Sequence, residues 1–295
     1  WSGRSSRSWR GSCGTGLAPG AVTDGPAPDP VVHELAGPPG APPLLVSHAT
    51  GFHGRCYRAL AEALGGRFRV VAIDHRGHGA TPAPEGFDPS DWRGYGADTL
   101  ALARRLAESH GGPIVGFGHS MGGATLILAA HAEPGLFERL VLFEPIGAPR
   151  MEVALEPDEI PLVAGARRRR RRFASLEEAH RNYASKPPLA ALPDDVLWDY
   201  VRHGFAPAAD GEGVELRCTP EHEAATFVGG FNNGVWELLP EVPVPVTVIG
   251  SGDGQHPAEL APAFAERLPA GGFVVLAELT HFGPLTHPDV VAALI

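Results

Sequence analysis

A serine stands at the centre of the pentapeptide Gly118-His119-Ser120-Met121-Gly122. The apolar run at 113–117 predicts a buried strand before it, and the apolar run at 121–130 predicts a buried helix after it. A serine on such a sharp strand-to-helix turn stands clear of the backbone, where a base can remove its proton. The flanking glycines leave room for the strand and the helix to cross closely. The pattern therefore predicts Ser120 as a nucleophile.

Candidates for the other groups that an activated serine needs lie further along the chain. His281 follows the last predicted strand, and Asp253 follows the strand before it. A histidine accepts the serine's proton, and a carboxylate orients that histidine and stabilises its charged form. Glu144 ends an earlier predicted strand and is an alternative acid. Residue type and position alone leave both carboxylates open.

Strands and helices alternate along most of the chain. Such alternation implies a doubly wound, mostly parallel sheet, in which ligands bind outside the carboxyl ends of the strands. The predicted strands are at 44–48, 69–74, 113–117, 140–143, 244–250 and 272–277, and the helices between them at 57–64, 95–110, 121–130 and 257–268. The polar residues at the strand ends are His48, Asp74, Ser120, Glu144 and Asp253.

The alternation stops between about Gly147 and Asn233. This stretch has helix-like pieces at 176–183 and 194–203 and no clear strand, so it predicts a helical cap inserted after the strand that ends near Phe143. We therefore divide the chain into a disordered tail at 1–24, a core at 25–146 and 234–295, and a cap at 147–233. The aromatic candidates for lining a substrate pocket are Phe173, Trp198, Tyr200, Phe227, Phe231 and Trp236.

Composition limits the classes of function. The 295 residues are 43% hydrophobic, enough for a sizeable core, and the net charge of −10 argues against a general affinity for nucleic acid or anionic membranes. Three scattered cysteines fit a reducing, cytoplasmic location, and no run reaches the ~20 apolar residues of a membrane span. The six arginines at 167–172 predict a solvated face of the insertion, with an anion-binding face as the alternative. The polar cluster at 218–223 lacks zinc-ligand spacing and predicts a turn into a helix.

These motifs together resemble those of the α/β-hydrolase superfamily, in its capped, esterase- and lipase-like group. The resemblance covers about Val31 to Ile295 and implies the α/β-hydrolase fold, no metal, no organic cofactor, and a triad of Ser120, Asp253 and His281. Asp253 holds the family's usual acid position, so we favour it over Glu144. His281 is preferred to His287, whose Thr-His-Pro setting suits a helix start. The segments that carry the resemblance are His48-Ala49-Thr50-Gly51-Phe52, Asp74-His75-Arg76-Gly77-His78-Gly79, Gly118-His119-Ser120-Met121-Gly122-Gly123, Gly250-Ser251-Gly252-Asp253 and Thr280-His281-Phe282.

The resemblance also implies an oxyanion hole made by two backbone N–H groups. One belongs to Met121, at the start of a helix, where the helix dipole is positive. The other comes from the loop after His48, where this chain has His-Ala-Thr-Gly-Phe in place of the family's His-Gly-x. Alignment on His48 nominates Thr50, whereas alignment on the following Gly-Phe pair nominates Phe52, which we favour.

We therefore expect a serine hydrolase that cleaves a carboxylic-ester bond of a small or acyl-chain substrate through an acyl-enzyme intermediate. Dehalogenases and epoxide hydrolases of similar fold need an aspartate where this chain has Ser120, which disfavours them. Carbon–carbon bond hydrolases and cofactor-free haloperoxidases keep the serine and stay open as alternatives. A non-catalytic ligand receptor on the same scaffold is the alternative of a different class. The sequence does not indicate an oligomeric state.

Overall fold

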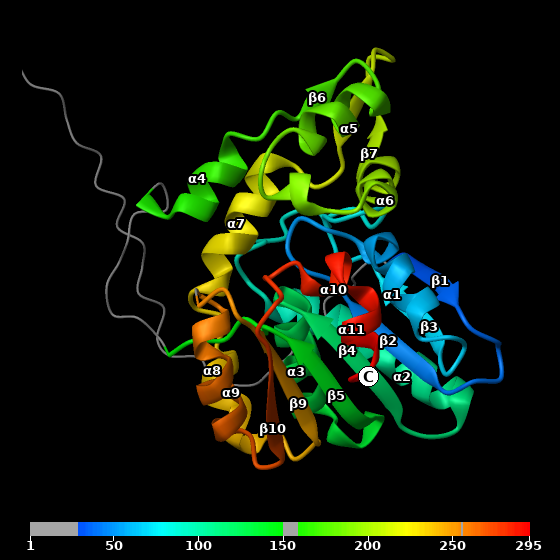
Figure 1. Cartoon of the computed structure of the whole chain (residues 1–295), viewed down its shortest axis with the longest axis vertical. Helices are drawn as coiled ribbons and strands as arrows, with labels where there is room; N and C mark the ends of the chain where they lie inside the picture. The colour runs from blue at the N-terminus through cyan, green and yellow to red at the C-terminus, as the bar shows by residue number, and fades with distance from the viewer. Residues whose placement is uncertain (1–28, 150–158, 255) are drawn as a thin grey trace, which may run out of the picture.

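The computed structural model describes residues 29–149, 159–254 and 256–295. A seven-stranded sheet with helices on both faces forms the core, and a second group of helices and short strands stands over one end of it (Figure 1). The predicted tail at 1–24 lies outside the described residues. None of the described helices is long and apolar enough to cross a membrane.

The central sheet has the predicted doubly wound, mostly parallel arrangement. Its strand order is β1-β3-β2-β4-β5-β9-β10, with β1 antiparallel to β3 and every other pair parallel. β1 was not predicted, because it lies half-exposed at the edge and follows a Pro/Gly-rich lead. The strands are β1 (Val32–Ala36), β2 (Pro43–Ser47), β3 (Arg69–Ile73), β4 (Ile114–His119), β5 (Phe137–Phe143), β9 (Val246–Ser251) and β10 (Gly271–Leu276).

Apolar side chains on both faces explain why the central strands are almost continuously hydrophobic. In β2, Leu44 and Val46 pack on one side of the sheet and Leu45 on the other, and all three are completely buried. Helices α1 and α11 cover the first side, and α2, α3 and α9 cover the second. The core helices are α1 (Arg58–Ala63), α2 (Arg93–His110), α3 (Met121–Ala132), α8 (Val235–Leu238), α9 (Ala261–Arg267), α10 (Gly283–Thr286) and α11 (Pro288–Ala292).

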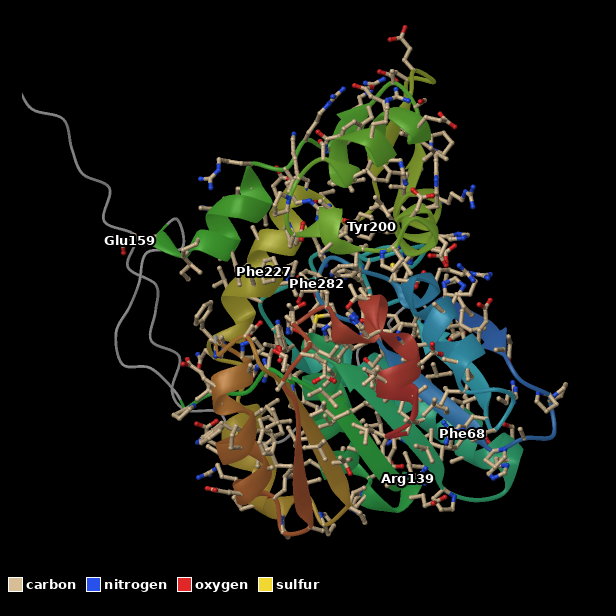
Figure 2. The ribbon with its side chains drawn as sticks, in the orientation of Figure 1. Phe68, Arg139, Glu159, Tyr200, Phe227 and Phe282 are labelled. Carbon is tan, nitrogen blue, oxygen red and sulfur yellow. The ribbon has the colours of Figure 1, made fainter. Side chains whose placement is uncertain are left out.

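The inserted region between β5 and α8, which we call the cap, is not purely helical. A three-stranded antiparallel sheet, in the order β6-β8-β7, lies among its helices, and this corrects the prediction that the insertion has no strand. Strands of two or three residues are too short to show an alternating pattern. Tyr200, Phe227 and Phe282 lie where the cap meets the core (Figure 2). The cap elements are α4 (Pro161–Arg167), β6 (Arg172–Phe173), α5 (Leu176–Ala184), α6 (Asp194–Gly204), β7 (Phe205–Pro207), β8 (Val214–Leu216) and α7 (Pro220–Gly230).

Buried histidines gather at the carboxyl ends of the strands. His48 donates from Nδ1 to the carbonyl of Ala49 (2.8 Å) and accepts at Nε2 from the backbone N–H of His75 (3.0 Å), so it is neutral with a fixed tautomer. Burial lowers the pKa of His53 and His222 to about 4 and that of His75 to about 3. Burial also lowers the pKa of His48, His78 and His119 well below the ordinary value.

These histidines should make the fold sensitive to acid. Their pKa values are lower in the folded chain than in the unfolded one, so their stabilising effect is complete above about pH 6.5 and is lost as the pH falls. Each contributes a slope of about 1.4 kcal/mol per pH unit. We expect the free energy of unfolding in urea to drop steeply between pH 6.5 and 4. His222→Gln should reduce this slope by about one proton, and an unchanged slope in this variant would contradict the lowered pKa of His222.

Gly122 should be irreplaceable for a steric reason. A Cβ there would lie 2.0 Å from the carbonyl oxygen of Ser47, which belongs to the neighbouring strand and cannot move aside. We expect Gly122→Ala to cost about 3 kcal/mol or more of unfolding free energy. Gly165→Ala is the matched control, because a Cβ at this position in α4 meets no atom within 4 Å. It should stabilise the chain by about 0.5–1 kcal/mol, as measured by urea denaturation.

Candidate active site

Ser120 lies on a strained turn between β4 and α3. Its φ of 57° and ψ of −117° are unusual for a residue with a side chain. A Cβ on Gly118 would lie 2.6 Å from the Cα of Gly123, so only glycine allows the strand and helix to approach this closely. The turn has the strained strand-to-helix geometry expected of a nucleophile on a rigid support.

Glu144 occupies the corresponding place at the end of the adjacent strand, β5. It has a φ of 45° and is the other described non-glycine residue with a positive φ. The backbone of Ser120 is bonded to this segment on both sides, because its N–H donates to Phe143 (3.0 Å) and its carbonyl accepts from Ile146 (3.2 Å). The two strained residues are therefore held side by side by main-chain hydrogen bonds.

The carboxylate of Glu144 binds His281. Nδ1 of His281 donates to Oε2 of Glu144 at 2.5 Å, and the backbone N–H of Ser251 donates to Oε1 at 2.7 Å. Glu144 is completely buried. Burial alone would raise its pKa, but the bonds from His281 and Ser251 outweigh this effect and lower the pKa, so Glu144 is a carboxylate. The arrangement fits a carboxylate that orients an imidazole and stabilises its charged form.

The carboxylate that contacts His281 is therefore that of Glu144, the alternative acid, and not that of Asp253, which the resemblance favoured. In the sheet, His119 of β4 pairs with Phe143 of β5, so the residue after Phe143 lies beside Ser120. Asp253 follows β9, one strand further from the nucleophile, in a loop where its side chain is exposed. The structure therefore brings His281 to Glu144, which the sequence left as the alternative.

His281 uses only one ring nitrogen for this carboxylate. Nδ1 carries the proton of the hydrogen bond to Glu144. The neutral ring of His281 therefore has its lone pair on Nε2, which can act as a base. Ser120 is only 7% exposed, and the described residues show no hydrogen bond between its hydroxyl and His281. Such bonds are often long in free enzymes and shorten when substrate binds.

The oxyanion loop also differs from the expectation. The N–H of Phe52 donates to the carbonyl of Ala49 (3.1 Å) and closes a tight turn, so it does not point freely towards the nucleophile. This partner of the Phe52 N–H speaks against the preference for Phe52 over Thr50. Within the described chain, the N–H of Thr50 makes no hydrogen bond and remains available. Met121 is the first residue of α3, where the N–H has no partner inside the helix.

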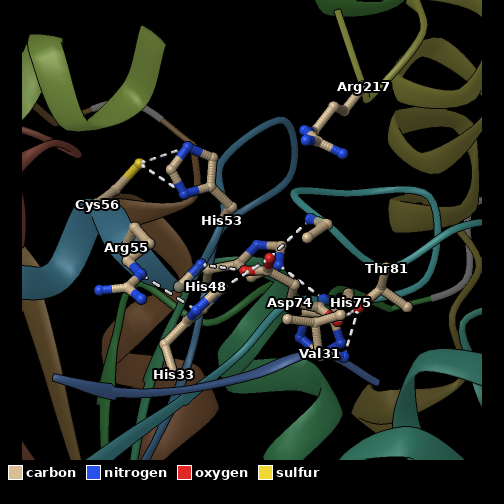
Figure 3. Close-up of polar contacts among 12 residues, drawn as sticks. Val31, His33, His48, His53, Arg55, Cys56, Asp74, His75, Thr81 and Arg217 are labelled. Atoms are coloured by element: carbon tan, nitrogen blue, oxygen red, sulfur yellow. Dashed lines mark hydrogen bonds and ion pairs between the residues drawn. The ribbon is translucent and has the colours of Figure 1, made fainter. Parts of the chain in front are cut away.

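Asp74 anchors the far end of this loop. Its carboxylate accepts hydrogen bonds from the N–H groups of Gly54 (2.8 Å) and Ala80 (2.8 Å) and from Nε2 of His33 (2.9 Å). Figure 3 shows Asp74 and His33 among these polar contacts. Burial would raise the pKa of Asp74, but the bond from His33 and the charges around it lower the pKa instead. One buried carboxylate thus joins β1, the oxyanion loop and the turn after β3.

Arg169 is the member of the arginine run that turns inward. Its guanidinium binds the carboxylate of Glu223 and the hydroxyls of Tyr183 and Tyr200. The carboxylate of Glu223 lies directly over Gly51, since a Cβ on Gly51 would fall 2.4 Å from Oε1. A polar, charge-paired cluster of the cap therefore packs on the oxyanion loop. Other arginines of the run form ion pairs nearer the cap surface, namely Arg170 with Glu178, Arg171 with Glu215 and Arg172 with Asp210.

Of the aromatic residues proposed to line a substrate pocket, some lie near the oxyanion loop and others pack elsewhere. The ring of Tyr200 lies 5.3 Å from that of Phe52, so it reaches the oxyanion loop. Phe173 packs inside the cap against Tyr183 and Phe205 (5.9 and 5.7 Å). The remaining candidates lie elsewhere: Trp198 stacks on His180, Phe227 and Phe231 pack beside α4, and Trp236 packs with Arg267.

Phe282 was not a candidate, yet it lies beside the base and its ring is 5.9 Å from that of Phe52. Its position directly after His281 was the available signal. The cluster at 218–223 forms the predicted turn into a helix, with Thr219 capping α7. Among the described residues, no group of three or more His, Cys, Asp or Glu side chains has the geometry to hold a metal ion.

Comparisons with known proteins bear on the fold and the family of this chain. The chain is 26% identical over 253 residues to 2-(acetamidomethylene)succinate hydrolase of Mesorhizobium japonicum, covering 84% of each protein. It is 39% identical over 113 residues to human monoglyceride lipase, a match that spans 37% of each. The crystal structure of E-2-(acetamidomethylene)succinate hydrolase superposes with a TM-score of 0.71 and 22% identity over 86% of this chain and 90% of that one.

A peroxisomal alpha-beta-hydrolase of Saccharomyces cerevisiae superposes with a TM-score of 0.72 and 19% identity, over 89% of this chain and 78% of that one. Residues 44–294 match the family described as the alpha/beta hydrolase family. The match includes the elbow, both candidate acids and the histidine. The chain therefore belongs to the alpha/beta hydrolase family.

Proposed function

We propose that the protein is a serine hydrolase that cleaves carboxylic esters of small molecules through an acyl-enzyme intermediate. The observation that carries this proposal is the 2.5 Å bond between His281 and the buried Glu144, beside a serine held at φ 57°. We assign Ser120 as the nucleophile, His281 as the base and Glu144 as the acid that orients it. Thr50 and Met121 supply the oxyanion N–H groups.

The reaction follows from these positions. Nε2 of His281 takes the proton of Ser120 as its hydroxyl attacks the ester carbonyl. The imidazolium that forms is stabilised by the carboxylate of Glu144, and the two backbone N–H groups stabilise the oxyanion. His281 then gives its proton to the leaving alcohol, and a water activated by the same histidine releases the acid.

The names of the relatives also include reactions other than ester hydrolysis. One is named a 2-(acetamidomethylene)succinate hydrolase, others are lipases, and another is a non-heme chloroperoxidase of Streptomyces lividans, 28% identical over 233 residues. The chloroperoxidase supports cofactor-free haloperoxidation as one alternative activity of the same serine site. Carbon–carbon bond hydrolysis is the other alternative, and it rests on the resemblance of the sequence motifs. We place the reaction in the reducing cytoplasm, since the described cysteines, Cys56 and Cys218, are buried free thiols.

The choice of acid can be tested directly. Glu144→Gln keeps the size of the side chain but cannot stabilise the imidazolium, so kcat for p-nitrophenyl acetate should fall by about 10³- to 10⁴-fold. Asp253→Asn, the matched control, should keep kcat within about threefold. Ser120→Ala should abolish turnover. A larger loss of kcat in Asp253→Asn than in Glu144→Gln would show that Asp253, in the loop after β9, is the acid.

Acyl-chain length provides a second test. The cap covers the oxyanion loop with Arg169, Glu223 and Tyr200, which are polar groups that a long alkyl chain would have to desolvate. We therefore expect kcat/KM for p-nitrophenyl esters to be highest for acetate or butyrate and at least about tenfold lower for palmitate. A maximum at a long chain would show that the acyl group avoids this part of the cap.

A further inference from the structure

The loop that carries the base needs support beyond Glu144. The neighbours of His281 on its N-terminal side, from Ala277 to Thr280, are exposed except for Leu279. One side chain from the elbow reaches this loop, because Nε2 of His119 lies 2.8 Å from the carbonyl oxygen of His281. His119 directly precedes Ser120, so this bond joins the nucleophile strand to the base loop.

The hydrogen bonds around His119 fix every proton. A carbonyl oxygen only accepts, so Nε2 of His119 must be the donor and Nδ1 must be an acceptor in the neutral ring. The hydroxyl of Tyr57 lies 2.8 Å from Nδ1 and donates to it. The same hydroxyl oxygen accepts from the N–H of Ala49 at 3.1 Å. The chain of bonds therefore runs in one direction, from Ala49 through Tyr57 and His119 to His281.

Burial keeps this chain neutral. Tyr57 and His119 are both completely buried. Burial lowers the pKa of the imidazole and raises that of the phenol, so neither group ionises near neutral pH. The two rings also pack edge to face, 6.1 Å apart, and the ring of His119 lies 4.8 Å from that of His281.

Ala49 is the first residue of the oxyanion loop and is held from two sides. Its N–H donates to Tyr57, and its carbonyl accepts from Nδ1 of His48 and from the N–H of Phe52. Thr50, which follows, has little freedom to move its N–H. The position of the oxyanion donor is thus connected through two side chains to the position of the base.

We propose that Tyr57 and His119 are positioning residues that tie the base loop to the oxyanion loop. They set the distance between His281 and the oxyanion site and take no part in proton transfer. This inference rests on the proposed hydrolase function and adds two residues that the triad does not contain. A misplacement of reacting groups by about 1 Å lowers rates about 100-fold, so such a connection has a measurable effect.

Tyr57→Phe is the decisive variant, with Tyr95→Phe as its matched control. Both tyrosines are completely buried, and each hydroxyl has two partners, which for Tyr95 are His222 and Thr226 on the cap helix α7. We expect similar losses of thermal stability in both variants. Tyr57→Phe should lower kcat for p-nitrophenyl acetate about 10- to 100-fold with KM changed less than threefold, whereas Tyr95→Phe should keep kcat within threefold. Equal values of kcat in the two variants would overturn the proposal.

Two further measurements separate this proposal from a packing effect. Nitrogen-15 NMR of histidine-labelled protein should show His119 neutral with its proton on Nε2, and a proton on Nδ1 would overturn the proposal. His119→Phe alone and the double variant His119→Phe with Tyr57→Phe should have the same kcat, because each of them breaks the same chain of hydrogen bonds. Additive losses would contradict it. Full activity in Ser120→Ala would instead reject the serine mechanism itself, so the two failures are distinguishable.

Discussion

The site depends on the main-chain hydrogen bonds between the ends of β4 and β5. The N–H of Ser120 donates to the carbonyl of Phe143, and the carbonyl of Ser120 accepts from the N–H of Ile146. Neither strand end can therefore move without the other. Both catalytic candidates at these ends have positive φ angles, which cost about 1–3 kcal/mol each and persist only where the surroundings enforce them. The buried parallel sheet supplies this enforcement.

A shell of buried polar groups holds the loops around these strand ends. Asp74 binds Gly54 and Ala80, and His48 binds Ala49 and the backbone of His75, so the oxyanion loop is tied at both of its ends. Such groups are costly to bury without partners, and here the bonds of Asp74 and His48 supply those partners. The consequence is a rigid surround in which the buried His48 must remain neutral.

The sequence predicted the sheet and the strand-to-helix turn at Ser120 because each has a local signal. Continuous apolar runs mark buried strands, and the glycines around Ser120 mark a close crossing of strand and helix. The choice between Glu144 and Asp253 had no local signal, because both carboxylates follow strands. It depends on the strand order, which places β5 between β4 and β9 and is not written in any single segment. The turn from Ala49 to Phe52 also lacked a local signal, because it became visible only with its hydrogen bond.

The position of the acid also constrains the cap. The insertion leaves the core just after Glu144 and returns near Asn233, whose side chain donates to the carbonyl of Ile146 at 3.2 Å. The two stems of the cap are thus fastened together two residues from the acid. At Gly147 a Cβ would fall 2.8 Å from the ring of Phe264, so the first stem also packs tightly on the core. With both stems fixed, the sequence between them can change the shape and charge above the oxyanion loop while the bond between Glu144 and His281 stays in place.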